Sequence, residues 1–461
     1  MTAPAIAAAP VIASAPHRLP LLGHGLPLLR RPLPYLRSLR ERGDIVRIHL
    51  GREPAYLVTR SDLAWRVLMG DAGTFTRDNV SPAVDVLFGA AVATLGGTAH
   101  RERRRLLAPS FHRKRIAEYA RVMTRVAGEH TGRWRDGQRL DVTTAIFDLS
   151  LATLSATLFN SPIGAAAVAE IHRSLPPALD QIPRRVLTPA PLLRVPIPAN
   201  RRFEAAAARL RAVFREVIEN YRADGVDRGD LLSALLFHRE EGPAGALTDK
   251  QVEDELVGFL VAGVDTPATT VAWILHELGC DAEIERRLHA EVDAVAGDGP
   301  ITPQHVHALT YTRQVIQEAL RHYAAWINLL EASSPVDLGE GARFPAGTTI
   351  ALSPYLVHHD PRLFTDPERF DPDRWSPDRA KDIAKDATIP FGAGVRRCPG
   401  DFYALTEMTI QIATIARRWR LEPAAGSAVR PATRSVVVYP DALSMIVRDR
   451  RHGSGRIPAA A

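Results

Sequence analysis

The stretch Phe391-Gly392-Ala393-Gly394-Val395-Arg396-Arg397-Cys398-Pro399-Gly400 decides the fold of this chain. It holds one of only two cysteines in the sequence. Pro399 suits the first position of a following helix, because its missing N–H would have no partner there. We therefore expect Cys398 at a helix N-terminus, where the dipole and the free N–H groups lower the pKa of a thiol. A structural cysteine beside a turn is the alternative, but it leaves the spacing of the other residues unexplained.

The same stretch resembles the haem-binding loop of the cytochromes P450, F-x-x-G-x-R-x-C-x-G, at all five fixed positions. The resemblance implies that Cys398 ligates the iron of haem b and donates electron density that favours O–O cleavage. It also implies that Phe391 shields the sulfur, that Arg396 pairs with a haem propionate, and that Gly394 and Gly400 permit a tight turn and a close approach to the macrocycle. The fold it implies is mostly α with small β-sheets, a triangular helical prism with a long central helix over the haem.

Two further elements extend the resemblance over most of the chain. Glu318-x-x-Arg321 matches the E-x-x-R element of the family, and Pro372-Asp373-Arg374-Trp375 lies where the family has P-x-R-[FW]. Alone, E-x-x-R is weak evidence, because ion pairs three residues apart are common on helix surfaces. By resemblance, Glu318, Arg321 and Arg374 form a buried charge triad that supports the loop before the cysteine.

The longest predicted helix starts at Thr248, where Thr248-x-x-Gln251 forms a capping box, and runs to about Leu278. Such a helix is about 45 Å long, enough to cross the domain. Its middle, residues 256–272, is apolar on nearly every side, so we expect it to be buried.

Inside this helix, Ala262-Gly263-Val264-Asp265-Thr266 resembles the oxygen-binding element [AG]-G-x-[DE]-T. By resemblance, Thr266 assists oxygen activation and Asp265 belongs to the proton relay. The alternative for Thr266 is a hydroxyl that bonds back to its own helix, which is common. Pro267 has no N–H for the carbonyl four residues back, Gly263, so we expect a kink and a freed carbonyl there.

His100-Arg101-Glu102-Arg103-Arg104 resembles the H-x-x-x-R helix that holds haem propionates in bacterial members. We assign His100 and Arg104 to that role, although on spacing alone a solvated basic face would be the better interpretation. After Arg321 the sequence departs from the family, because Glu331 takes what we identify as the place of a propionate-binding arginine. A carboxylate cannot pair with a propionate, so we expect one contact to the haem to be missing or inverted.

The substrate is expected to be lipophilic. Residues 193–203 and the C-terminal segment look most similar to actinobacterial members that oxidise sesquiterpenes, although a macrolide or a fatty acid would fit equally well. The candidate pocket residues are apolar or small: Phe259, Ala262, Gly263, Trp326, Ile327 and Leu329.

Composition and charge limit the kinds of partner and the location that we expect for this protein. The chain has 461 residues, 46% of them hydrophobic, and a net charge of +6. The arginines are scattered among acids, which argues against nucleic acid as a partner. No apolar run reaches the ~20 residues of a membrane span, and the first 20 residues lack the order of a signal peptide. We expect a cytoplasmic monomer without a membrane anchor.

Other segments carry simpler expectations. Residues 44–59 predict a β-hairpin, and the proline-rich stretch between Pro176 and Asn200 cannot be a long helix, so we expect a loop or a lid there. His305, His307, His358 and His359 are expected at the surface, and Cys280 as a packed thiol. We divide the chain into a flexible N-terminus (1–18), a haem domain (19–452) and a C-terminal tail (453–461).

These features predict a monooxygenase that uses O2 and takes electrons from a separate ferredoxin and ferredoxin reductase, because the chain has no flavin or iron–sulfur signature. One alternative keeps the fold and changes the reaction to oxidative coupling or cyclisation of a natural product. Another is a haem-binding protein without turnover, for which Asp265 and Thr266 would have no purpose.

Overall fold

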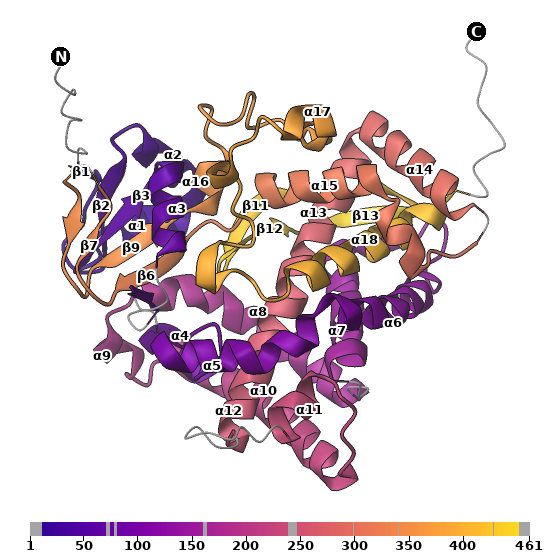
Figure 1. The fold of residues 1–461 in the computed structure, drawn as a ribbon, viewed down its shortest axis with the longest axis horizontal. Coiled ribbons are helices and arrows are strands. Elements are labelled where there is room, and N and C mark those ends of the chain that lie inside the picture. The colour runs from indigo at the N-terminus through magenta and orange to yellow at the C-terminus, as the bar shows by residue number, and fades with distance from the viewer. Residues whose placement is uncertain are drawn as a thin grey trace, which may run out of the picture.

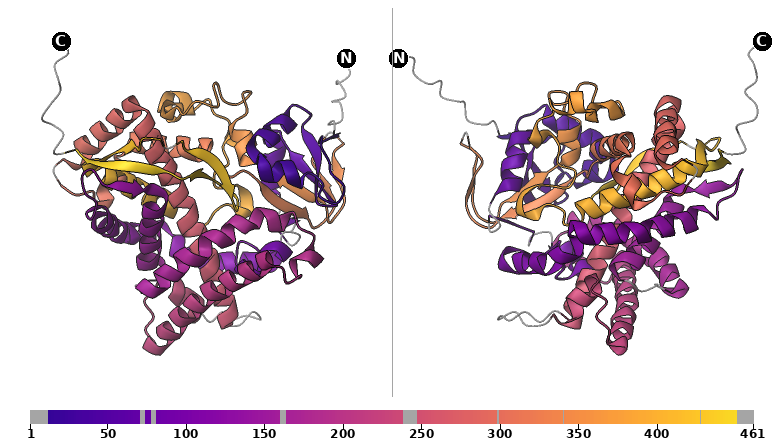
Figure 2. Two further views of the ribbon diagram at one scale, coloured as in Figure 1. Left: turned by 180° about the vertical axis from the view of Figure 1, so that it is seen from behind. Right: turned by 45° about the vertical axis from the view of Figure 1, so that its right-hand side comes forward.

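Helices fill most of the molecule, and a six-stranded sheet lies at one end of it (Figure 1). The computed structural model describes residues 12–70, 74–77, 81–159, 164–237, 247–297, 299–339, 341–426 and 428–450. Seen from behind, the outline is broadly triangular (Figure 2). The expected class, mostly α with small β-sheets, is confirmed.

The α-helices of the described residues are α1 Gly25–Arg30, α2 Pro32–Arg40, α3 Ser61–Met69, α4 Ser81–Phe88, α5 Gly97–Leu107, α6 Arg113–Thr131, α7 Val142–Leu158, α8 Ala165–Val186, α9 Ala190–Leu193, α10 Pro198–Asp224, α11 Leu231–Phe237, α12 Asp249–Leu260, α13 Thr266–Cys280, α14 Ala282–Ala296, α15 Thr310–His322, α16 Pro354–His358, α17 Pro377–Ala380 and α18 Asp401–Arg418. Short 3-10 helices are η1 Ala108–Phe111, η3 Pro303–His307, η4 Pro372–Trp375, η5 Lys385–Ala387 and η6 Gly394–Arg396.

The largest sheet joins segments that are far apart in the sequence. Its order is β1 (Ile12–Ser14), β2 (Ile45–Leu50), β3 (Glu53–Val58), β9 (Thr349–Leu352), β6 (Asn328–Ala332) and β4 (Phe75–Thr76). Strands β2 and β3 form the antiparallel hairpin expected over residues 44–59.

Three smaller sheets complete the β structure. They are β10 (Trp419–Pro423) with β13 (Ser444–Asp449) and β5 (Arg139–Asp141), β11 (Arg430–Arg434) with β12 (Val437–Asp441), and β7 (Val336–Asp337) with β8 (Arg343–Phe344).

The long helix predicted from Thr248 is present in three parts. The Thr248–Gln251 capping box opens α12, a π-helical segment follows at Val261–Asp265, and α13 continues to Cys280. This helix is long and apolar enough to cross a membrane, but two thirds of its most apolar window is buried inside the protein. It lies in the main core, against α7 and α18.

The prediction of a loop or lid after Pro176 is wrong for the first half of that stretch. Helix α8 contains Pro176, Pro177 and Pro183 and runs on to Val186. Interior prolines each remove a helical hydrogen bond at a cost of about 3 kcal/mol. Here the apolar side of α8, which includes Leu175 and Leu179, is fully buried, and α8 packs along α10. This burial offsets the lost bonds.

Three smaller expectations also need correction. Within the supposedly flexible residues 1–18, Ile12–Ser14 pairs with β2, while residues 1–11 and the tail 453–461 lie outside the described residues. His358 and His359 are buried rather than at the surface. Arg321 donates to the carbonyl of His358, the His358 ring accepts from the backbone N–H of Ile389, and the His359 ring bonds the carbonyl of Tyr355. Cys280 is exposed at the last position of α13.

Candidate active site

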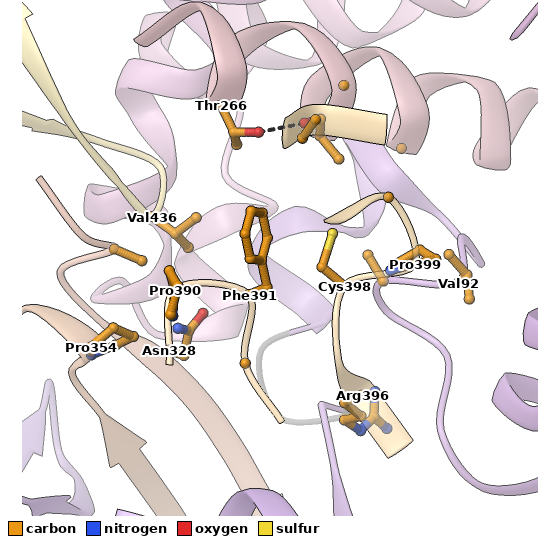
Figure 3. Close-up of a pocket in the computed structure, with 18 of the residues that line it drawn as sticks. Val92, Thr266, Asn328, Pro354, Pro390, Phe391, Arg396, Cys398, Pro399 and Val436 are labelled. Carbon is orange, nitrogen blue, oxygen red and sulfur yellow. Dashed lines mark hydrogen bonds between the residues drawn. The ribbon is translucent and has the colours of Figure 1, made fainter. Parts of the chain in front are cut away.

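A cavity of about 410 Å³ lies between the cysteine loop and the middle of the long helix. Cys398 lines it from the loop, and Thr266 lines it from the opposite side, where the π segment meets α13. Figure 3 shows the two side chains facing the same space, with the ring of Phe391 beside the sulfur. The structure therefore brings together residues that the sequence separates widely.

The loop before α18 is built to present Cys398. The backbone N–H of Cys398 donates to the carbonyl of Phe391 (2.9 Å), which closes the turn. Gly394 has a φ of +63°, and a Cβ there would lie 2.2 Å from the carbonyl oxygen of Leu68, so only glycine fits without a shift of backbone. These contacts explain why the loop has its sequence.

Cys398 was expected at a helix N-terminus that lowers the pKa of its thiol, and the structure differs on both points. Helix α18 begins at Asp401 with Gly400 as its N-cap, so Cys398 lies outside the helix rather than at its first turn. Burial raises the pKa of the thiol; the N–H of Gly400 and the guanidiniums of Arg104 and Arg397 act in the other direction. Coordination to a metal cation would favour the thiolate form against this burial.

The Thr266 hydroxyl bonds back to its own helix, which was the alternative interpretation of this residue. Its hydroxyl donates to the carbonyl of Ala262 at 2.6 Å (Figure 3). In a π-helix the bonds join residues five apart, so the carbonyl that Pro267 leaves without an N–H is that of Ala262, not that of Gly263 as predicted. The Thr266 hydroxyl takes over this carbonyl, and its oxygen still accepts from the cavity side.

The side chain of Asp265 faces Arg434 instead of the cavity. It is 4% exposed and does not line the cavity, unlike its neighbour Thr266. Burial raises its pKa to about 6, against the attraction of Arg434, whose Nη1 lies 3.9 Å from Oδ1. A carboxyl with a pKa near neutrality can both hold and release a proton under physiological conditions.

A cluster of cations lines one end of the cavity. His100, Arg104 and Arg396, all predicted to bind propionates, are joined by Arg77, which sequence reasoning missed. Burial, together with the charges of Arg396, Arg104 and Arg77, lowers the pKa of His100 to about 4, so its ring is neutral near pH 7. The Nε of Arg77 is buried without a hydrogen-bond partner. Such mutually repelling cations require an anion, and the two propionates of haem fit this requirement.

Arg77 was missed because its place depends on strand pairing. In the antiparallel pair of β4 and β6, Thr76 lies opposite Glu331, so the next residue, Arg77, comes beside Leu330. Leu330 and Arg77 line the cavity, whereas Glu331 does not. The expected inverted contact at Glu331 is therefore wrong, because successive residues of a strand face opposite sides.

The predicted lining of the substrate pocket is correct only in part. Phe259, Ala262 and Gly263 line the cavity as proposed. Trp326, Ile327 and Leu329 do not; they pack into or against the small core under the six-stranded sheet. Residues from this part of the chain that do line the cavity are Tyr323, Ala324, Ala325, Asn328 and Leu330.

The triad of Glu318, Arg321 and Arg374 forms as expected. Arg321 holds Glu318 in a bidentate pair (2.8 and 2.9 Å), and Arg374 reaches the same carboxylate at 3.3 Å. All three side chains are buried. Arg321 and Arg374 also donate to backbone carbonyls of residues 358–369, so the triad anchors the chain that leads to the cysteine loop.

A second buried ion pair had no signal in the sequence. Arg103 of α5 pairs with Glu255 of α12, and Glu255 lines the cavity. Burial raises the pKa of Glu255 to about 7. The pair ties the helix of His100 and Arg104 to the long helix.

A cysteine loop on one side of a cavity, an oxygen-binding helix segment on the other and a cationic end define a haem-thiolate protein. The family model for cytochrome P450 matches residues 14–447. The chain belongs to the cytochrome P450 family, and its cofactor is haem b.

Relatives in Streptomyces species resemble the chain over nearly its whole length. Cyclooctat-9-en-7-ol 5-monooxygenase of Streptomyces melanosporofaciens is 39% identical over 90% of this chain and 90% of the relative. Cyclooctatin synthase of the same organism is 38% identical, over 90% and 91%. Pentalenene oxygenase of Streptomyces avermitilis is 35% identical, over 96% and 98%.

Proposed function

We propose that this enzyme inserts one oxygen atom from O2 into a terpenoid. The observation that carries the proposal is the cavity between Cys398 and Thr266, which apolar and small side chains line, among them Phe259, Ala262 and Val436. Such a lining binds a hydrocarbon by burial and offers few polar groups that would reject it. Two of the similar proteins are named for oxygenation of cyclooctat-9-en-7-ol and of pentalenene.

The reaction consumes a substrate C–H bond, O2, two electrons and two protons, and yields the alcohol and water. Haem supplies the oxygen-activating chemistry when it is bound. Cys398 provides the thiolate, and Phe391 covers it from water. The Thr266 hydroxyl, whose hydrogen is donated to the carbonyl of Ala262, accepts a hydrogen bond at the oxygen side, and Asp265 passes protons inward from the protein surface.

His100, Arg104, Arg396 and Arg77 hold the propionates in this proposal. The three arginines are cations at the same end of the cavity, and a guanidinium can bind a carboxylate through two parallel hydrogen bonds, while the neutral imidazole of His100 can donate one N–H. The flat macrocycle then lies between the cysteine loop and the π segment.

Electrons come from an acidic ferredoxin, itself reduced by ferredoxin reductase, in the cytoplasm. Cationic side chains are exposed on α5, at the start of α6 and in the cysteine loop: Arg101, Arg105, Arg113, Lys114 and Arg397. Arg113 lies over the ring of Phe402 (4.8 Å) and Arg397 pairs with Asp401, so these two cations lie beside the start of α18, directly after the Cys398 loop. Opposite charge would steer an acidic partner to this face.

The test is reconstitution of the purified haem protein with a ferredoxin, its reductase and NADPH. Sesquiterpene and diterpene hydrocarbons and their monoalcohols are first screened for a low-to-high-spin shift, and binders are then incubated for product analysis. We expect a product one oxygen heavier than the substrate, with the label from ¹⁸O2. A product of coupling or ring closure without added oxygen, or label from water, would overturn the proposal.

A further inference from the structure

The relay acid Asp265 has one charged side chain beside it. Among the described residues, its only ion pair is with Arg434 of β11, at 3.9 Å. Asp265 is buried, and the Arg434 side chain is only 15% exposed. A buried carboxylate has little water to stabilise its charge, so this guanidinium has a large influence on it.

Arg434 is itself held from two further elements. Its Nε donates to Oδ1 of Asp180 on α8 at 2.8 Å. Its guanidinium lies over the ring of Tyr439 on β12, 4.2 Å from the ring centre. Three contacts from three elements fix a side chain that would otherwise have many rotamers.

The β11–β12 hairpin carries Arg434 at a defined place above the cavity. The backbone N–H of Trp326 donates to the carbonyl of Val436 (3.0 Å), and its indole N–H donates to the carbonyl of Ser435 (2.9 Å). Val436 and Val437 line the cavity. The hairpin is thus tied to the cavity wall, and α8 packs against β11.

We infer that Arg434 is a positioning residue for the relay acid, and that its ion pair with Asp180 of α8 sets how readily Asp265 exchanges its proton. The inference rests on the proposed function, in which Asp265 passes protons to the oxygen side. Arg434 does not line the cavity, so it acts through Asp265.

Removal of Arg434 and removal of Asp180 should shift the pKa of Asp265 in opposite directions. Attraction by Arg434 lowers the pKa of Asp265, while the carboxylate of Asp180 raises it. Among the described residues, Arg434 and Asp180 are the charged groups that act on the pKa of Asp265. Tyr439 of β12 faces Arg434, and α7 presents Leu154 against the π segment. Removal of Arg434 must therefore raise the pKa of Asp265, and removal of Asp180 must lower it.

The experiment follows the carbonyl stretch of protonated Asp265 by infrared difference spectroscopy of the haem-loaded protein between pH 4 and 9. The band is assigned by its loss in Asp265→Asn. We expect Arg434→Gln to move the titration midpoint up by about one pH unit and Asp180→Asn to move it down by roughly half a unit. Arg434→Lys, which keeps the charge, should stay near the parent protein, and so should Arg430→Gln on the same strand.

Coupling is measured on the same variants as product formed per NADPH, against peroxide released. The pH of half-maximal coupling should move in the same direction as the infrared midpoint. Shifts of equal sign in Arg434→Gln and Asp180→Asn, or no shift in either, would overturn the inference. If Asp265→Asn couples like the parent protein at every pH, the relay in the proposed function fails instead, and the infrared midpoints still decide the role of Arg434. The carbon monoxide difference spectrum shows which variants retain the haem-thiolate bond.

Discussion

At the residue scale, Arg77 shows how a single cation completes a binding site. It reaches the cavity from the residue after β4, beside Leu330. Burial, together with the nearby Arg396, lowers the pKa of Arg77 to about 10, so the protein holds this charge at a cost in the absence of an anion. A propionate would remove that cost.

We predict that Arg77→Gln weakens haem retention. Loss of one charged hydrogen-bond donor is worth about 1.5–3 kcal/mol, so transfer of haem to apomyoglobin should accelerate about tenfold or more. Arg343→Gln is the matched control, because Arg343 is exposed on β8 and pairs only with Asp337 among the described residues. Equal transfer rates for Arg77→Gln and the parent protein would show that Arg77 does not bind the cofactor.

At the element scale, the π segment explains how an apolar helix accommodates polar groups at its centre. The i→i+5 bonds and Pro267 together leave the carbonyl of Ala262 to the Thr266 hydroxyl. The same widening turns Thr266 toward the cavity and Asp265 toward Arg434. A regular α-helix could not free this carbonyl without breaking a backbone bond.

Pro267→Ala tests this arrangement. The new N–H can bond the carbonyl of Ala262 in the i→i+5 pattern of the π segment, which displaces the Thr266 hydroxyl from that carbonyl. We expect the thermal midpoint to rise, since alanine is favoured over proline inside a helix by up to about 3 kcal/mol, and product per NADPH to fall severalfold as peroxide release increases.

Pro198→Ala is the control for that prediction. Pro198 is the first residue of α10, where a proline N–H would have had no helical partner, so neither stability nor coupling should change much. Unaltered coupling in Pro267→Ala would mean that the π segment does not depend on the proline.

At the scale of the whole molecule, buried acids couple stability to pH. Glu407 of α18 is fully buried, and burial raises its pKa from 4.5 to about 8. Its Oε1 accepts from Gln411, whereas its Oε2 has no partner. A carboxyl with a raised pKa in the folded state stabilises the protein fully below its unfolded pKa, and this contribution is lost as the pH rises toward 8.

Glu407→Gln should therefore gain stability relative to the parent protein as the pH increases from 5 to 8. The amide has no proton to lose, and the expected relative gain is on the order of 3 kcal/mol in the free energy of unfolding. Thermal or denaturant unfolding of both haem-loaded proteins across this range measures it. The control is Glu216→Gln, which replaces an exposed side chain on α10 and should show no such trend. A constant difference between Glu407→Gln and the parent protein would contradict the raised pKa.

Much of the site could be predicted because its parts are encoded locally. The cysteine loop, the Glu318–Arg321 pair and the acid–hydroxyl pair before Pro267 each lie within a few consecutive residues, and their spacing follows from turn and helix geometry. The helix of residues 248–280 was predicted for the same reason, apart from its π segment.

Local patterns failed where the outcome depended on packing between distant segments. Helix α8 continues through three prolines because α10 covers its apolar side. Leu330 rather than Glu331 faces the cavity because β6 is paired between β4 and β9, and this pairing sets which side of the strand is inside.

The sequence by itself predicted the ligand of the iron and the position of the oxygen-binding element, and it determined the family. Only the tertiary structure decided which cations gather at the cavity and which charges surround Asp265. Arg77 and Leu330 meet through strand pairing, and Asp180, Asp265 and Arg434 meet through the packing of three separate elements. These contacts join residues that are far apart in the sequence, so no rule of spacing along the chain predicts them.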